Sequence, residues 1–142
     1  MTKTDERNKF LTDVLITAVE GGIGYWSQIE GYDYDNADAL KRGGLLYISG
    51  IERKDIRTPI ARIDEDEDLG TVYIVHLNLG TIVAGVLNIL KDEFNVNALI
   101  RDIVRVANRQ NDAAPDDGPG DIDAEVADVI VQAGIFGKII FG

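Results

Sequence analysis

The apolar residues of this chain change their period halfway along it, and this change limits the folds that the chain can adopt. In the first half, segments rich in β-branched and aromatic side chains are typical of strands; they cover residues 23–29, 45–51, 59–63 and 72–77. In the second half, apolar residues recur every three or four positions, as on one face of a helix. Because the later strands are joined by short connections, we predict antiparallel pairing rather than parallel strands with crossover helices.

Four segments have the apolar spacing of helices: residues 4–20, 78–90, 96–110 and 121–132. Thr4 or Asp5 is the expected N-cap of the first helix, and Asp121 that of the last. The segment 78–90 is apolar almost all round, which predicts an interior helix lying against the sheet. The last helix is expected to bury one side only.

These patterns predict an α+β fold as a single globular domain over residues 1–142, in which an antiparallel sheet of about four to five strands carries three to four packed helices. The end of the chain, residues 138–141 (KIIF), is predicted to form a short strand in this sheet, because an exposed apolar tail would be sticky. The stretch at about 111–120 holds two of the three Pro residues and is predicted to be a flexible acidic loop. Residues 59–63 are expected to alternate, with Ile60 and Arg62 on one face of their strand.

The composition excludes several kinds of chemistry. The chain has no Cys, which removes disulfides, thiolate metal sites and Cys nucleophiles. The single His, His76, lies within a strand pattern, which favours a structural role over that of a general base. No nucleophile-elbow motif surrounds Ser27 or Ser49, the two serines. We therefore expect no cofactor and favour a protein that is not an enzyme, with a carboxylate-based active site as a remaining alternative.

The charge of the chain restricts its partners. The formal net charge is −11, which argues against direct binding to nucleic acid or to an anionic membrane surface. No apolar run approaches the roughly 20 residues of a membrane span, and residues 1–9 do not resemble a signal peptide. We expect a cytoplasmic protein, with homo-oligomerisation as an open alternative because the helical region is so apolar.

Charged side chains recur at helical spacing in two places. Arg101, Arg105 and Arg109 lie four residues apart and are expected to share one outward face. A second series in the next helix is formed by Asp121, Glu125, Asp128 and Gln132. One interpretation is a set of exposed ion pairs between the two helices, each worth roughly 0–1 kcal/mol. The other is an anion site in which the three arginines bind a phosphate or a partner's carboxylates.

The adjacent residues Tyr25 and Trp26 follow a glycine-rich turn. Such a pair is a candidate stacking wall for a ring or base. The turn leads from a helix into a strand, whereas phosphate-binding glycine loops lead from a strand into a helix, so it is not a nucleotide fingerprint. Packing of Trp26 in the core is the competing interpretation.

Acidic residues gather at 33–38, 64–68 and 112–128. Asp64, Asp66 and Asp68 offer alternating oxygen ligands, but Leu69 and Val75 stand where an EF-hand loop needs Gly and Glu. A solvated charge run is therefore favoured over a calcium site. We assign a candidate acidic interaction surface to six residues of these clusters: Asp64, Asp66, Asp68, Asp121, Glu125 and Asp128.

Three segments of the chain resemble an uncharacterised family of small acidic proteins carried by bacteriophages and plasmids, chiefly of actinobacteria. They are residues 13–26 (DVLITAVEGGIGYW), 120–132 (GDIDAEVADVIVQ) and 136–142 (FGKIIFG). The resemblance implies a mobile-element protein in a bacterial cytoplasm and brings no catalytic residue with it.

Two functions are expected from these features. The first is a non-enzymatic protein that binds and blocks a host component, for example as a DNA mimic or against a host defence, its partner being a host protein that handles nucleic acid. The alternative is a protein that sequesters a nucleotide signal, with Arg101, Arg105 and Arg109 on the phosphates and Tyr25 and Trp26 stacking, between subunits of a homo-oligomer.

Overall fold

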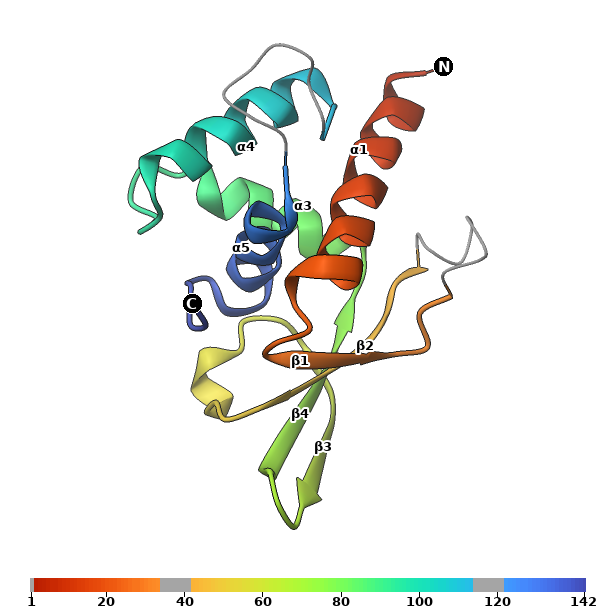
Figure 1. Ribbon diagram of the computed structural model, residues 1–142, viewed down its shortest axis with the longest axis vertical. Helices are drawn as coiled ribbons and strands as arrows, with labels where there is room; N and C mark the ends of the chain where they lie inside the picture. Colours follow the sequence, from red (N-terminus) through yellow and green to blue (C-terminus); the bar gives the residue numbers. More distant parts are fainter. Residues whose placement is uncertain (1, 34–41, 114–121) are drawn as a thin grey trace.

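The computed structural model describes residues 2–33, 42–113 and 122–142. Its elements in chain order are α1 (Lys3–Thr17), the π-helical turn η1 (Ala18–Gly22), β1 (Ser27–Glu30), β2 (Gly44–Ser49), the 3-10 turn η2 (Arg53–Asp55), β3 (Ile60–Asp66), β4 (Gly70–Leu77), α3 (Leu79–Ile89), α4 (Ala98–Gln110) and α5 (Ala124–Phe136). The predicted α+β class, with a four-stranded antiparallel sheet and four helices in the described part of the chain, is confirmed. The helices gather on one side of the sheet, and the β3–β4 hairpin extends away from them (Figure 1).

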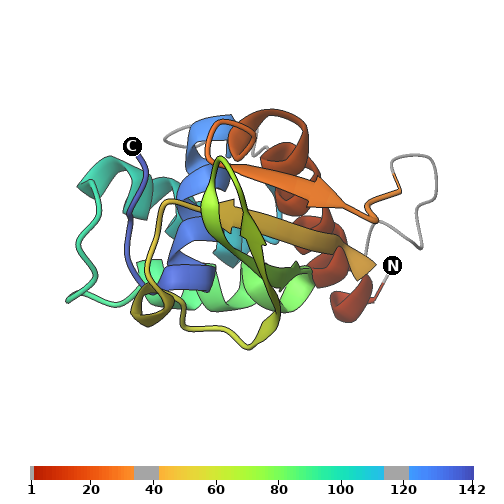
Figure 2. The ribbon, with the colours of Figure 1, turned by 90° about the horizontal axis from the view of Figure 1, so that it is seen from below.

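The sheet has the strand order β1-β2-β4-β3, so β2 and β4 are central and β1 and β3 form its edges. Leu46 of β2 pairs with Val75 of β4, and both side chains enter the core beneath the helices. Their neighbours point the other way because side chains alternate along a strand. Tyr47 and Ser49 therefore lie on the outer face of the sheet, the face turned away from the helices. The view from below shows the sheet lying across the helical layer (Figure 2).

A β-bulge in β3 breaks the alternation that the sequence predicts for residues 60–63. Ile60 pairs with Val75, whose side chain faces the core, whereas Arg62 pairs with Ile74 on the opposite face. The prediction that Ile60 and Arg62 share a face is therefore wrong, because one extra residue between them turns the strand over. The bulge places Arg62 and Asp64 on the outer face, in rows with Ile74 and Val72 of β4.

The interior helix of the fold is α5. All of its residues from Val126 to Phe136 are buried, and it packs against α3, α1 and η1. The expectation of one inner side for this helix is wrong, as is its N-cap: Asp123 caps the helix. Asp121 lies outside the described residues, as does most of the predicted loop at 111–120. The segment 78–90 does form α3, capped by Asn78, but Leu87 on it is 54% exposed.

The two ends of the chain differ from their predictions. The N-cap of α1 is Thr2 rather than Thr4 or Asp5. The last residues, 137–142, form no strand; their backbone is bonded instead to the side chain of Gln132, as described below.

Helices α3 and α5 touch through their backbones. A Cβ atom built on Gly85 of α3 would overlap the carbonyl oxygen of Ile130 in α5. One built on Gly134 of α5 would overlap the carbonyl oxygen of Thr81 in α3. Only glycine allows so close an approach at either position.

In the part of the chain that the structure describes, no helix has the length and apolar character needed to cross a bilayer.

Candidate functional site

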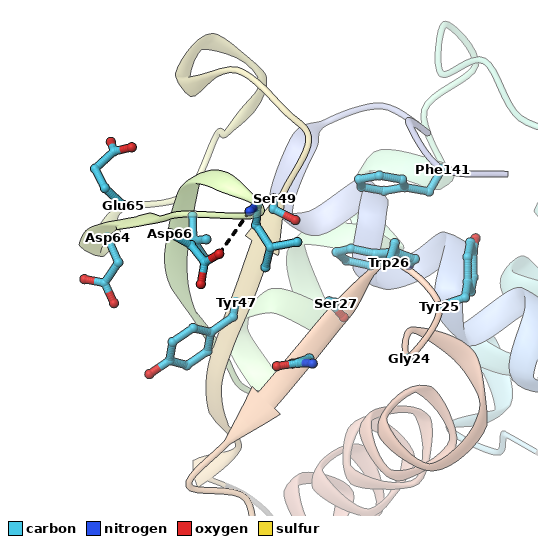
Figure 3. Close-up of a pocket in the computed structure, with 13 residues that line it drawn as sticks. Gly24, Tyr25, Trp26, Ser27, Tyr47, Ser49, Asp64, Glu65, Asp66 and Phe141 are labelled. Atoms are coloured by element: carbon cyan, nitrogen blue, oxygen red, sulfur yellow. Dashed lines mark hydrogen bonds between the residues drawn. The ribbon is translucent and has the colours of Figure 1, made fainter.

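A cavity of about 600 Å³ lies between the outer face of the sheet and the turn that leads into β1. It brings together residues from five parts of the chain: Gly24, Tyr25, Trp26, Ser27, Gln28, Tyr47, Ser49, Asp64, Glu65, Asp66, Leu69, Val72 and Phe141. Figure 3 shows Trp26 and Phe141 on one side of the cavity and the carboxylates of the β3–β4 hairpin on the other. Four predicted site residues, Tyr25, Trp26, Asp64 and Asp66, thus line one cavity.

The aromatic side of the cavity is a stack of rings. Trp26 lies parallel to Phe141, with ring centroids 5.0 Å apart and an angle of 8° between the planes. Phe136 of α5 packs against both rings at a steeper angle. Trp26 is 7% exposed and also lines the cavity. The same side chain is therefore both a core residue and part of the cavity wall.

Asp128 of α5 holds the side chains of Trp26 and Tyr25 in place. Its carboxylate accepts hydrogen bonds from Trp26 Nε1 at 2.8 Å, from Tyr25 Oη at 2.6 Å and from Gln132 Nε2 at 3.0 Å. Asp128 is only 7% exposed, so its assignment to an acidic surface is wrong. A buried carboxylate is retained where donors surround it, and two of the three donors here come from residues more than a hundred positions earlier in the chain.

Gln132, one turn after Asp128, holds the end of the chain in place. It is fully buried, and its Oε1 accepts hydrogen bonds from the backbone N–H groups of Ile140 and Phe141 at 2.9 and 2.8 Å. Its Nε2 also donates to the carbonyl oxygen of Phe141 at 3.0 Å. One side-chain amide thus replaces the strand partner predicted for residues 138–141 and sets Phe141 over Trp26.

The opposite side of the cavity carries Asp64, Glu65 and Asp66. Asp66 Oδ1 accepts hydrogen bonds from the backbone N–H groups of Leu69 and Asp68 at 3.0 and 2.8 Å, which closes the hairpin turn. These backbone hydrogen bonds lower the pKa of Asp66. Asp68 is exposed beside the cavity rather than part of its lining.

Arg62 lies at the edge of the cavity and was not singled out by the sequence. Its Nε donates to Asp64 Oδ1 at 3.0 Å, its NH2 group donates to Tyr47 Oη at 2.9 Å, and its guanidinium lies 5.8 Å from the centroid of the Tyr47 ring. Glu30, as hydrogen-bond acceptor, raises the pKa of Tyr47. No local pattern in the sequence predicts the contact between Tyr47 and Arg62, because the bulge that brings them together leaves no mark in the apolar spacing.

The three arginines of the predicted anion site differ in their contacts. Arg101 is half-buried and donates to the carbonyl oxygens of Ile89, Lys91 and Phe94, so its guanidinium holds the segment that follows α3. Arg105 pairs with Asp102 of its own helix at 2.8 Å, and Arg109 is exposed. Among the described residues no ion pair joins α4 to α5. Asp128 faces the core, and Glu125 is exposed but forms no such pair. None of the three arginines lines the described part of the cavity that contains Tyr25 and Trp26.

Within residues 2–33, 42–113 and 122–142, no group of three or more His, Asp or Glu side chains has the arrangement of a metal site. His76 is exposed and lines a separate small cleft with Thr81 and Asn78.

The environment of Tyr25 predicts a response to alkaline pH. Burial of its hydroxyl and the hydrogen bond to Asp128 raise the pKa of Tyr25 to about 12, although most of the ring is exposed. In the unfolded chain the hydroxyl ionises near its ordinary value of about 10. Between pH 10 and 12 the unfolded state therefore loses a proton that the folded state keeps, and stability falls as pH rises.

We expect the free energy of unfolding, measured by urea titration across this range, to fall less steeply for Tyr25→Phe than for the wild type. Tyr73→Phe is the control, because Tyr73 lies in β4, where it pairs with Ile63, whereas the donors to Asp128 are Tyr25, Trp26 and Gln132. Equal slopes for the wild type and Tyr25→Phe would contradict the assignment.

Comparison of the chain with protein-family models, with curated proteins and with solved structures finds no match.

Proposed function

We propose that this protein acts without catalysis, by binding a positively charged segment of a partner protein in the cavity between the aromatic stack and the β3–β4 hairpin. The observation that carries the proposal is the charge of the described cavity lining: it contains three carboxylates and no Lys or Arg. The field inside such a hollow favours cations and excludes phosphates.

The shape and chemistry of the walls support a peptide-like occupant. Trp26, Phe141 and Tyr47 offer aromatic surface on which the methylene groups of a long basic side chain can lie. Aromatic faces also attract a cationic group within about 6 Å of the ring. Ser27, Gln28 and Ser49 add hydrogen-bonding groups to the lining of the cavity.

The expected biological role follows from this chemistry. A protein that handles nucleic acid presents basic side chains to phosphates, and carboxylates on a projecting hairpin can occupy the same positions. The proposal thus keeps the role of a blocking protein or DNA mimic in a bacterial cytoplasm, in the mobile-element setting that the sequence resemblance implies. The acidic surface then consists of the half-buried Asp64 and the exposed residues Glu65, Asp66, Asp68 and Glu125.

Removing the hairpin charges tests the proposal. The triple variant Asp64→Asn, Glu65→Gln, Asp66→Asn is expected to bind tri-arginine amide and tri-lysine amide about 3- to 150-fold more weakly than the wild type, since three partly exposed charge pairs are each worth about 0.2–1 kcal/mol. The measurement is isothermal titration calorimetry at low ionic strength, repeated at high salt, where binding should weaken because salt screens exposed charges.

A matched control separates the cavity from the overall charge. The variant Glu6→Gln, Asp92→Asn, Glu93→Gln removes three exposed carboxylates that lie outside the cavity and changes the net charge equally. It should bind both peptides as the wild type does. Equal losses in the two triple variants, or no binding by the wild type, would refute the proposal.

A further inference from the structure

The geometry of Arg62 shows how this site holds a guanidinium group. Its planar guanidinium donates two hydrogen bonds, one from Nε to the Asp64 carboxylate and one from the NH2 group to the Tyr47 hydroxyl. The side chains of Arg62 and Asp64 are 53% and 43% exposed, so solvent reaches the pair and the contact can open without unfolding the sheet.

The contacts of Arg62 are with residues that line the cavity, although Arg62 itself lies outside the lining. The β-bulge is the cause, since it turns residue 62 from the core face to the outer face. The Asp64 carboxylate and the Tyr47 hydroxyl therefore already bind the guanidinium of Arg62. These are the two groups that a bound cation would contact.

From this arrangement, and resting on the function proposed above, we infer that the cavity selects an arginine side chain of its partner and that Arg62 is an internal competitor for that guanidinium. An incoming guanidinium reproduces the two contacts of Arg62 on Asp64 and Tyr47, with its methylene stem along the aromatic wall. Arg62 then swings into solvent, and its charge no longer neutralises Asp64.

The proposed contacts distinguish arginine from lysine. A guanidinium presents several N–H groups in one plane and can reach a carboxylate and a phenol oxygen together, whereas an ammonium is a compact, strongly hydrated charge. Tri-arginine amide is therefore expected to bind more tightly than tri-lysine amide, and the preference should diminish in Tyr47→Phe, which lacks the phenol oxygen.

The direct test removes the competitor. In Arg62→Gln, the dissociation constant for tri-arginine amide, measured by calorimetry on the full chain, should fall about two- to fivefold, the range of one exposed ion pair. Arg105→Gln is the matched control: it breaks the Arg105–Asp102 pair on α4, changes the net charge equally, and should leave the dissociation constant unchanged. In an Asp64→Asn background, Arg62→Gln should give no gain, because the shared acceptor charge is gone.

The outcomes separate this inference from the function on which it rests. If basic peptides bind through the hairpin carboxylates but Arg62→Gln gives no gain, or the same gain as Arg105→Gln, the competitor role is refuted and the proposed function stands. If arginine and lysine peptides bind equally, the selectivity for arginine is refuted. If neither peptide binds the wild type or Arg62→Gln, both proposals fail.

Discussion

Gly85→Ala is expected to destabilise the protein by about 3 kcal/mol or more, the upper end of the range for overpacking a close-packed interior. The added methyl group would overlap the carbonyl oxygen of Ile130, a backbone atom that cannot rotate away. Relief requires α3 and α5 to separate, and these two helices make the most extensive helix–helix contact of the fold. The gain of about 1 kcal/mol in helix propensity from Gly to Ala is too small to offset this strain.

Urea unfolding followed by circular dichroism measures the effect. Gly134→Ala, on the other side of the same contact, should behave alike, since its methyl group would overlap the carbonyl oxygen of Thr81. Gly21→Ala is the control: its methyl group would meet only the Ala124 side chain, at an ordinary distance of 3.4 Å. A Gly85→Ala protein as stable as Gly21→Ala would show that α3 and α5 do not meet at these glycines.

Asp128→Ala is expected to cost about 2–4 kcal/mol of folding free energy. The variant leaves the donors of Trp26, Tyr25 and Gln132 without their shared acceptor, and a buried unsatisfied donor costs about 1–3 kcal/mol. The Tyr25 hydroxyl is only partly buried, on a side chain that is largely exposed, and it recovers part of its loss through water. The Trp26 indole has no such compensation, so its ring should become mobile against Phe141.

Near-ultraviolet circular dichroism of Trp26, the one Trp in the chain, reports this loosening alongside the stability measurement. Asp128→Asn keeps an acceptor oxygen for Trp26 and Gln132 and should lose clearly less stability. Glu125→Ala, an exposed acidic residue on the same helix, should change stability by no more than about 0.5 kcal/mol. If Asp128→Ala were as mild as Glu125→Ala, the buried network would not hold the aromatic wall.

The sequence predicted the elements of this fold well and their faces less well. Short β-rich segments with short connections specified the antiparallel sheet, and of the two starts that the apolar pattern allowed for the next helix, Asn78 and Thr81, the structure has Asn78 as the N-cap. The helix α5 was misjudged because Asp128 and Gln132 gave it a polar face at helical spacing. Both are buried because distant partners satisfy them: Tyr25 and Trp26 for one, the backbone of Ile140 and Phe141 for the other.

The candidate site was predictable in its residue types and not in its assembly. Tyr25 and Trp26 stood out as adjacent aromatic residues, and Asp64 and Asp66 as parts of a charge run. Their common cavity depends on the pairing of β3 with β4, whose bulge no local pattern reveals. The contacts of Arg101 were not predictable for a similar reason: spacing indicates which residues share a helix face but not which carbonyl groups that face will meet.

The position of β3 at the edge of the sheet gives its charges a second consequence. An edge strand exposes unpaired backbone groups to which another chain can add, and charged side chains are a common protection against such aggregation. Here the protecting charges are Arg62, Asp64, Glu65 and Asp66, the same residues that shape the cavity rim. Neutralising them would expose an adhesive edge and would also remove the negative charge of the cavity, so one short strand couples the protection of the sheet edge to the charge of the cavity.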